Sequence, residues 1–179
     1  MNLNHSGIGA RVGWIGCLTA AGLTFLVIAL VPSVFAQRSD KQEVHLYFAD
    51  AKRPFLVSEP RVMVNSGDPI LFGRQLMTEL IKGSTGGNLA TIPAGTQLRA
   101  LFLLDDGTAV ADFTDSLRKN HPGGCRREQL TLFSIVNSLT LNVPEIDRVK
   151  ILINGADIRT LTGHVPLDFP LTADLLLTR

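Results

Sequence analysis

The sequence predicts an α+β domain in which β-hairpins alternate with two amphipathic helices packed on an antiparallel or mixed sheet, preceded by an apolar N-terminal helix. Three observations predict this class. Apolar residues alternate on both sides of Asp106-Gly107, which is typical of a β-hairpin. Residues 70–81 and 126–141 carry apolar side chains at helical spacing. Asn154-Gly155 is a second turn signal between apolar runs. The order hairpin, helix, hairpin, helix, hairpin indicates a layered domain.

The first 36 residues differ in composition from the rest. Residues 12–31 are apolar or small and contain no ionisable side chain other than Cys17. Their number fits a membrane-spanning helix of roughly 20 residues, whereas Val34-Phe35-Ala36 is typical of a signal-peptidase site. Residues 1–36 are therefore a cleaved signal peptide or an uncleaved membrane anchor. Either alternative implies export, with residues 37–42 as a linker and residues 43–179 as one domain.

The exported part has no net charge. One of the 17 basic residues, Arg11, lies in the N-terminal segment, which leaves 16 basic residues against 16 acidic ones. This balance argues against nucleic acid as the partner and against a polybasic membrane-surface role, because both draw on an excess of Lys and Arg. Cys17 lies in the apolar segment and cannot pair with Cys125 inside the domain. We therefore expect a fold without a disulfide.

The first two strands are predicted by alternation. Val44, Leu46 and Phe48 point to one side of a strand that ends near Asp50. A second extended piece covers residues 55–64, and two prolines interrupt it, so an edge strand or an irregular one is expected there. An exposed edge at residues 55–64 could accept a partner's strand.

Two helices are predicted next. Asp68-Pro69 provides an N-cap and a proline at the first helical position, and Gly83 ends the helix. In the second helix, residues 126–141, the apolar side chains gather on one side. The side predicted to be polar carries Arg127, Thr131, Ser134 and Ser138. Val143-Pro144 closes this helix, because the residue before proline avoids helical angles.

The central hairpin is predicted over residues 98–114. Leu98, Ala100, Phe102 and Leu104 alternate on one face, and the leucines between them make the other face apolar too. This pattern predicts a strand in the middle of a sheet, covered on both sides. Asp106-Gly107 is expected to form a two-residue turn with positive φ at both positions.

The C-terminal third is predicted to form a last hairpin and a tail. Residues 149–153 form a strand, Asn154-Gly155 a two-residue turn, and residues 158–161 the returning strand. The apolar residues of the tail, 163–179, are expected to pack against the core.

Cys125 is the strongest candidate for chemistry. It precedes a predicted helix, lies beside Arg126 and Arg127, and follows His121 by four residues. Such surroundings lower a thiol's pKa and favour the nucleophilic thiolate. However, any small residue suits this position, and the intervening Pro-Gly-Gly leaves the geometry of His121 and Cys125 open. A surface thiol is the preferred interpretation, with a thiol enzyme or redox protein as the alternative.

The other candidates favour structural roles. The acidic cluster Asp105, Asp106, Asp112 and Asp115 is better explained by turns than by a metal site, because its spacing does not match a Ca²⁺ loop. The Gly-rich residues 83–87 follow a helix, whereas phosphate loops precede one, so a flexible connector is expected. His45 and His164 have no second ligand at metal spacing. The sequence thus predicts no catalytic, cofactor-binding or metal-binding residue.

Several short segments, in their order and spacing, resemble the GerMN domain family, first associated with bacterial sporulation and spore germination proteins. They are Leu46-Tyr47-Phe48, residues 76–83, Ile92-Pro93-Ala94-Gly95-Thr96, Asp106-Gly107-Thr108, Asp112-Phe113-Thr114, residues 129–139 and residues 149–155. The resemblance implies an exported, non-enzymatic α/β module, similar in shape to ring-building motifs, whose relatives sit on membrane anchors or are lipoproteins. This sequence has Gly83-Ser84 where the family usually has Gly-Pro, and one copy where the sporulation protein has two.

Together these features lead us to expect a non-catalytic cell-envelope module, secreted or anchored in the inner membrane through its N-terminal segment. Its expected partners are an envelope protein or peptidoglycan, in envelope assembly or in a sporulation or germination-type process, with a homo-oligomer as a further option. Nucleic acid and cofactors are not expected. The alternatives are an envelope thiol enzyme or redox protein using Cys125, and a small-ligand binding domain.

Overall fold

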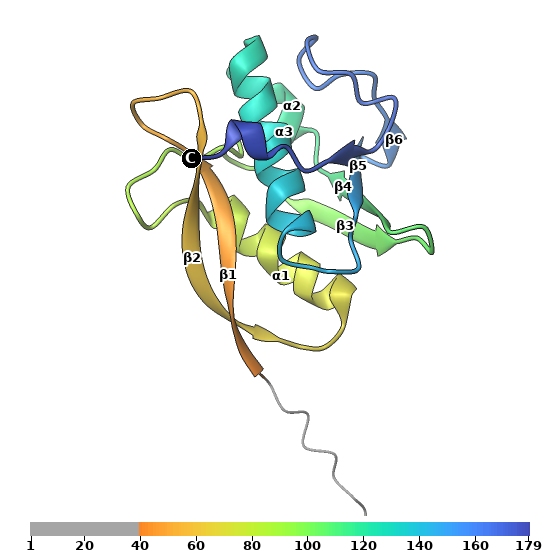
Figure 1. Cartoon of the computed structure of the whole chain (residues 1–179). Coiled ribbons are helices and arrows are strands. Elements are labelled where there is room, and N and C mark those ends of the chain that lie inside the picture. Colours follow the sequence, from red (N-terminus) through yellow and green to blue (C-terminus); the bar gives the residue numbers. More distant parts are fainter. Residues whose placement is uncertain (1–39) are drawn as a thin grey trace, which may run out of the picture. The chain divides into compact units, whose positions relative to one another are not determined.

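A computed structural model describes residues 40–179, and the predicted signal peptide or anchor, residues 1–36, lies outside this range (Figure 1). The strands are β1 (Asp40–Ala49), β2 (Leu56–Asn65), β3 (Leu98–Leu103), β4 (Thr108–Phe113), β5 (Arg148–Ile153), β6 (Ala156–Asp157) and β7 (Leu171–Thr172). The helices are α1 (Pro69–Lys82), α2 (Ser116–Lys119), α3 (Cys125–Thr140) and the 3₁₀ helix η1 (Leu175–Leu177). No helix within residues 40–179 is long and apolar enough to cross a membrane.

The strands form two sheets. β1 and β2 pair with each other as a long antiparallel hairpin. The second sheet has the order β3-β4-β5-β6, with β7 also paired to β5. The expected α+β class is confirmed. Of the two alternatives left open, an antiparallel or a mixed sheet, the second sheet is mixed, because β4 and β5 are parallel while its other pairs are antiparallel. Parallel neighbours need a long crossover connection, and α3 lies within it.

α1 follows its sequence signals. The Asp68 carboxylate accepts hydrogen bonds from the N–H groups of Ile70 and Leu71, at 2.8 and 3.0 Å. Pro69 occupies the first helical position, where its missing N–H leaves no hydrogen bond unmade. The inner face buries Phe72, Leu76, Met77 and Leu80. The predicted start and end of this helix are confirmed.

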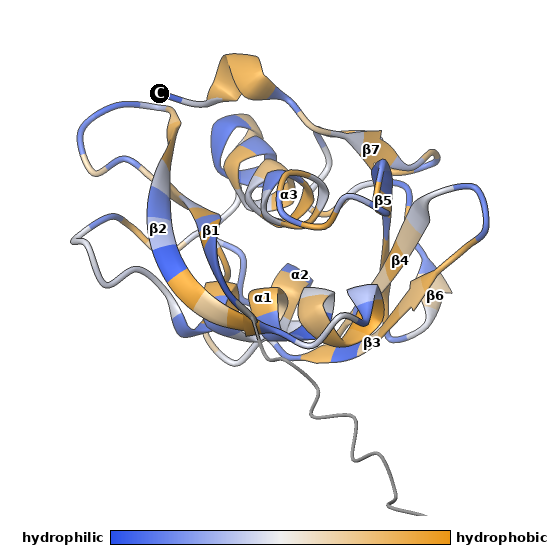
Figure 2. Ribbon diagram, turned by 60° about the horizontal axis from the view of Figure 1, so that its bottom comes forward, coloured by the Kyte–Doolittle hydropathy of each residue, from blue (hydrophilic) through white to orange (hydrophobic). Residues whose placement is uncertain are grey.

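α3 lies between the β1–β2 hairpin and the second sheet, so it is surrounded by protein (Figure 2). Thr131, Ser134 and Ser138 of its predicted polar face are buried, whereas Arg127 at the start of the helix is exposed as predicted. Ser134 donates to the carbonyl of Tyr47 at 2.6 Å, and Ser138 accepts from the Tyr47 N–H at 3.1 Å. Just beyond the helix, Asn142 bonds both backbone groups of His45 at 2.8 Å. These polar side chains supply hydrogen-bond partners for the backbone N–H and C=O groups on the edge of β1 that faces away from β2, because buried backbone groups need such partners.

β3 differs from its prediction. It is an edge strand covered on one face only, and Phe102, on the face away from the core, is 56% exposed. A bulge between Leu98 and Ala100 inserts one residue and reverses the alternation, so Leu101 faces the core in place of Phe102. A single inserted residue moves every later side chain to the other face.

The two turn signals have different outcomes. Asn154 and Gly155 both have positive φ, 52° and 77°, and join β5 to β6 in the expected two-residue turn. The β3–β4 turn is longer: the Leu104 N–H bonds the carbonyl of Thr108, and Gly107 is its only residue with positive φ. The expected positive φ at Asp106 is wrong, because its carboxylate accepts from the Thr108 N–H at 3.0 Å instead.

The C-terminal region is less regular than predicted. β6 ends at Asp157, so the expected strand over residues 158–161 is absent from this described segment. β7 was not predicted. In η1 only Leu177 is buried, whereas Leu175 and Leu176 are 61% and 86% exposed. The expectation that the tail packs on the core is confirmed for Leu167, which belongs to the main core, for Val165 and Leu171, which pack against it, and for Leu177, but not for Leu175 and Leu176.

Candidate functional site

The outer edge of β2 presents unpaired backbone groups. In β1, His45 and Tyr47 direct their N–H and C=O groups away from β2 and toward Asn142 and α3. His45 lies opposite Pro60 and the register continues with period two, so every second residue of β2, including Val62 and Val64, directs its backbone groups outward. Pro60 fits this pattern, since it has no N–H to lose. The expected edge strand is confirmed, although β2 runs through Pro60 without interruption.

Only one end of this edge is covered within the described residues. The Arg179 N–H donates to the carbonyl of Leu56 at 2.9 Å, and Thr178 bridges to Leu56. The section from Ser58 to Val64 has no strand partner on its outer side within residues 40–179. A free section of this length can pair with one extended segment.

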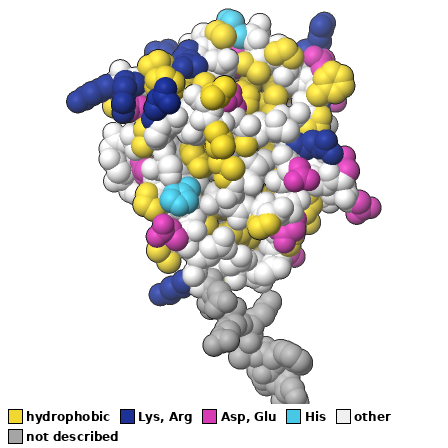
Figure 3. Space-filling view, in the orientation of Figure 1, with side chains coloured by type: hydrophobic (Ala, Val, Ile, Leu, Met, Phe, Trp, Pro, Cys, Tyr) yellow, Lys and Arg dark blue, Asp and Glu magenta, His cyan; other side chains and the backbone are white. Residues whose placement is uncertain are grey.

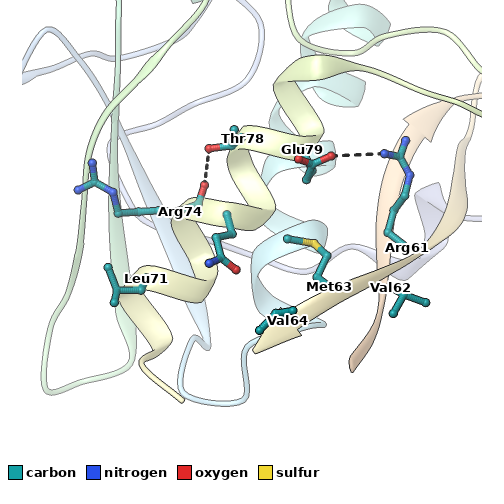
Figure 4. Close-up of a pocket in the computed structure, with 9 residues that line it drawn as sticks. Arg61, Val62, Met63, Val64, Leu71, Arg74, Thr78 and Glu79 are labelled. Atoms are coloured by element: carbon teal, nitrogen blue, oxygen red, sulfur yellow. Dashed lines mark hydrogen bonds and ion pairs between the residues drawn. The ribbon is translucent and has the colours of Figure 1, made fainter. Parts of the chain in front are cut away.

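α1 lies beside this section and makes it one wall of a groove of about 630 Å³ (Figure 4). We call it the β2–α1 groove. It is lined by Arg61, Val62, Met63, Val64, Leu71, Arg74, Gln75, Thr78 and Glu79. Consecutive residues of β2 line it, so the groove follows the strand edge and not one face of the hairpin. Val62 is 68% exposed and Leu71 52%, which makes the walls partly apolar.

An ion pair closes one end of the groove. Arg61 lies 3.6 Å from the Glu79 carboxylate and donates to the carbonyl of Gly83 at 3.2 Å (Figure 4). Arg74 has no carboxylate within 4.0 Å in the described part of the chain, so the groove carries one uncompensated positive charge.

The Gly-rich segment after α1 is pinned to Glu59. The buried carboxylate accepts bonds from Ser84 Oγ, the Asn88 side chain at 2.8 Å, and the backbone N–H groups of Thr85 and Gly86 at 3.2 and 3.3 Å. Burial alone would raise the pKa of Glu59, but these bonds outweigh it and lower the pKa below its ordinary value. The predicted flexible connector is therefore an ordered loop that binds an internal carboxylate.

The acidic cluster is divided among separate structural roles. Asp112 binds Arg99 and the Gly155 N–H, both at 2.8 Å, and Asp115 pairs with Arg118 and Lys119. Asp106 pairs with Arg148 at 3.3 Å. Within residues 40–179, no three His, Cys, Asp or Glu side chains are arranged to hold a metal ion.

His121 is committed to internal hydrogen bonds. Its Nδ1 accepts from the Gly123 N–H at 3.0 Å, and its Nε2 lies 3.1 Å from Thr131 Oγ1, which donates to the carbonyl of Thr91. Burial lowers the pKa of His121 and favours the neutral ring that this pattern requires. Both ring nitrogens are used, so the geometry does not form the Cys125–His121 pair. Cys125 is an exposed, free thiol at the start of α3.

Replacing Cys125 by serine should therefore have little effect. We expect Cys125→Ser to change the free energy of unfolding by less than about 0.5 kcal/mol, because the side chain is exposed. Chemical denaturation of the two proteins measures this, and a thiol-reactive dye gives the reactivity of the native cysteine. A dye reaction far faster than that of a free cysteine would favour the redox alternative.

The two remaining histidines are also placed. His45 Nδ1 lies 2.8 Å from Ser58 Oγ on the β1–β2 hairpin. His164 Nδ1 lies 2.8 Å from Glu128, a fully buried carboxylate at the start of α3 that sequence reasoning passed over. Glu128 and Glu59 each accept hydrogen bonds from a loop distant in the sequence, and no residue spacing in the sequence indicates these contacts.

Comparison with known proteins agrees with this fold. The profile of the Germane family, described as "Sporulation and spore germination", matches residues 45–159. The chain belongs to the Germane family. This confirms the GerMN resemblance. No curated protein sequence matches this Germane chain.

Solved structures show the same fold. The first GerMN domain of the sporulation protein GerM from Bacillus subtilis aligns with a TM-score of 0.60 at 24% identity, over 73% of this chain and 97% of that one. The tandem GerMN domains of the same protein align with a TM-score of 0.58 at 24% identity, over 74% of this chain and 46% of that one. A Clostridium perfringens chain described as a candidate lipoprotein aligns with a TM-score of 0.53 at 25% identity, over 74% of this chain and 87% of that one.

The resemblance implied Gly-Pro after the first helix of this Germane domain, and the chain has Gly83-Ser84 there. Ser84 Oγ donates to Glu59 and accepts from the Gly86 and Asn88 N–H groups at 3.1 and 2.9 Å. A proline has no hydroxyl and could not make these bonds. The loop following α1 is thus stabilised by hydroxyl bonds that a proline after Gly83 would not provide.

Proposed function

We propose that this Germane domain is a non-catalytic cell-envelope module that binds an extended segment of a partner protein along the β2–α1 groove. The observation that carries the proposal is the free outer edge of β2, with a helix beside it and exposed valines on it. Backbone hydrogen bonds from such an edge supply affinity, and side chains of the added strand select the partner.

The groove also indicates what segment it takes. Val62, Val64 and Leu71 offer apolar contacts, and Arg74 offers one positive charge that has no carboxylate partner within residues 40–179. A segment that alternates apolar residues and carries one acidic residue opposite Arg74 complements these walls. The envelope location is supported by the apolar residues 12–31 and by the similarity to the Clostridium perfringens candidate lipoprotein. A role in a sporulation or germination-type process is supported by the family description.

A proline at position 62 tests strand addition. The Val62 N–H points away from β1, as the missing N–H of Pro60 does, so Val62→Pro should keep the β1–β2 pairing and remove only an outward donor. We expect it to weaken partner binding at least about tenfold, since the added strand loses a hydrogen bond and its register. Val62→Thr, which keeps the N–H, is the matched control, and thermal unfolding verifies that both variants fold.

Photo-crosslinking of the full chain, expressed in cells, identifies the partner. A photo-crosslinking residue at Val64 should link to one extended segment of an envelope protein, whereas the same residue at Phe169, 80% exposed and not a lining residue of the groove, should not. The Val64 crosslink should disappear in Val62→Pro and remain in Val62→Thr. Equal crosslinking at Val64 and Phe169, or a Val64 crosslink unaffected by Val62→Pro, would refute binding of the partner along the β2–α1 groove. Crosslinks to peptidoglycan or to a second copy would replace the proposed partner by those alternatives.

A further inference from the structure

A second hollow of about 590 Å³ lies at the tip of the β1–β2 hairpin, away from the β2–α1 groove. We call it the hairpin-tip pocket. Four segments that are distant in the sequence enclose it: the end of β1 with the following loop, residues 89–93, residues 120–122, and the first turns of α3. A volume of this size holds a small organic molecule.

The inner wall of the pocket is apolar. Ile92 and Leu130 are 6% and 8% exposed, and Pro93 and Pro122 complete the wall with carbon surface. His121, the main polar group there, already uses both ring nitrogens. The inner wall therefore favours a hydrocarbon body over a polar one.

The mouth of the pocket is cationic. Arg126 and Arg127 line it, and neither has a carboxylate partner within residues 40–179. Arg126 is held in place, because its guanidinium lies 5.6 Å from the centre of the Phe55 ring and donates to Gln129 at 3.2 Å. Arg179 stacks on the same ring at 4.5 Å. A positioned guanidinium retains further N–H donors for an oxyanion.

The carboxylate that lines the pocket does not neutralise this charge. Asp50 is occupied by the backbone N–H groups of Lys52 and Arg53, at 2.7 and 2.9 Å, and by the Arg53 guanidinium at 3.1 Å. Lysine and arginine side chains accordingly gather at this end of the molecule, at the upper left of Figure 3. The balance of 16 basic and 16 acidic residues in positions 37–179 conceals this local excess.

We propose that the hairpin-tip pocket binds a small amphipathic carboxylate, with its oxyanion at Arg126 and Arg127 and its apolar body against Ile92, Leu130 and Pro122. Two sources present this chemistry: a free organic acid, and the C-terminal carboxylate of a peptide that ends in an apolar residue. The hairpin-tip pocket shares no lining residue with the β2–α1 groove. Carboxylate binding can therefore be tested separately from the proposed binding of a partner strand.

Calorimetric titration of the full chain in zwitterionic nanodiscs tests the pocket. The probes are 4-phenylbutyrate for the free acid and N-acetyl-alanyl-leucine for the peptide end, each compared with its neutral amide. We expect at least one acid to bind with a dissociation constant of about 1 mM or below, and its amide to bind at least about tenfold more weakly. The acid that binds identifies the source.

Three variants separate pocket binding from general attraction. Arg127→Glu removes a mouth cation, and Ala90→Phe fills the pocket from an exposed lining position without changing charge. Arg159→Glu makes the same charge change at an exposed residue that does not line the pocket. We expect Arg127→Glu and Ala90→Phe to weaken binding of the acid at least about tenfold, and Arg159→Glu to leave its affinity unchanged. Any of four results would overturn the proposal. They are equal affinity for the acid and its amide, loss of acid binding in Arg159→Glu, unchanged acid binding in Ala90→Phe, and no saturable binding of either acid.

Discussion

Replacing Glu128 by alanine should lower the free energy of unfolding by about 3–5 kcal/mol, the largest effect we expect from one substitution. The carboxylate is fully buried in the first turn of α3. It accepts hydrogen bonds from the backbone of Leu161, Thr162 and His164 at 2.9–3.0 Å, from the Thr162 hydroxyl at 2.7 Å, and from His164 Nδ1 at 2.8 Å. Alanine would leave these donors without a partner. Urea denaturation at neutral pH measures the loss.

The same carboxylate predicts how stability depends on pH. Burial raises the pKa of Glu128, but bonds from Thr162 and His164 outweigh it and lower the pKa from 4.5 to about 2. A group with a lowered native pKa contributes stability above its unfolded pKa and loses it as the pH falls toward the native pKa. Glu128 should thus contribute roughly 3 kcal/mol that disappears between pH 4.5 and pH 2.

Glu128→Gln is the control for the charge, because glutamine has the same shape and does not titrate. The stability difference between wild type and Glu128→Gln should be large at pH 7 and shrink as the pH approaches 2. A difference that stays constant over this range would show that the Glu128 charge is not stabilised by the loop.

The second large effect should come from the serines of α3. We expect the double variant Ser134→Ala/Ser138→Ala to lose about 2–5 kcal/mol, since it removes the partners of both backbone groups of Tyr47. The sign of this change is informative. Alanine is the better helix former, so on a solvated face the same double substitution would stabilise the protein slightly.

Thr78→Ala on α1 is the matched control. Thr78 is exposed, and its hydroxyl bonds only the carbonyl of Arg74 four residues earlier. This variant should be as stable as wild type or slightly more stable. If the Ser134 and Ser138 substitutions behaved like Thr78→Ala, the burial of α3 against β1 would be contradicted. Thermal unfolding of the proteins side by side decides it.

Local chemistry explains what was predictable. β1 follows from the alternation of Val44, Leu46 and Phe48, all fully buried. α1 follows from Asp68-Pro69 and its amphipathic period, and the β5–β6 turn from Asn154-Gly155. In each case the residues that define the element are neighbours in the sequence, so the pattern is complete without knowledge of the rest of the chain.

The errors and the alternatives left open share another cause. The bulge between Leu98 and Ala100 depends on pairing across to β4, and the parallel pairing of β4 with β5 depends on the path of α3. The serines of α3 have the composition of a solvated face, yet they bond a strand edge that is 91 and 87 residues away in the sequence. Composition within a segment does not distinguish water from a distant backbone as the hydrogen-bonding partner.

The sequence by itself determined the two long helices, α1 and α3, the hairpin order, the edge character of β2 and the membership in the Germane family. Only the tertiary structure decided that α3 is central, that Glu59 and Glu128 hold distant loops, and that the open edge of β2 lies beside α1 in a groove. It also collected Arg126, Arg127 and Arg179 around the hairpin tip. The physical reason is that caps, turns and periodicity act over a few residues, whereas burial and electrostatics act between residues that only the folded chain brings together.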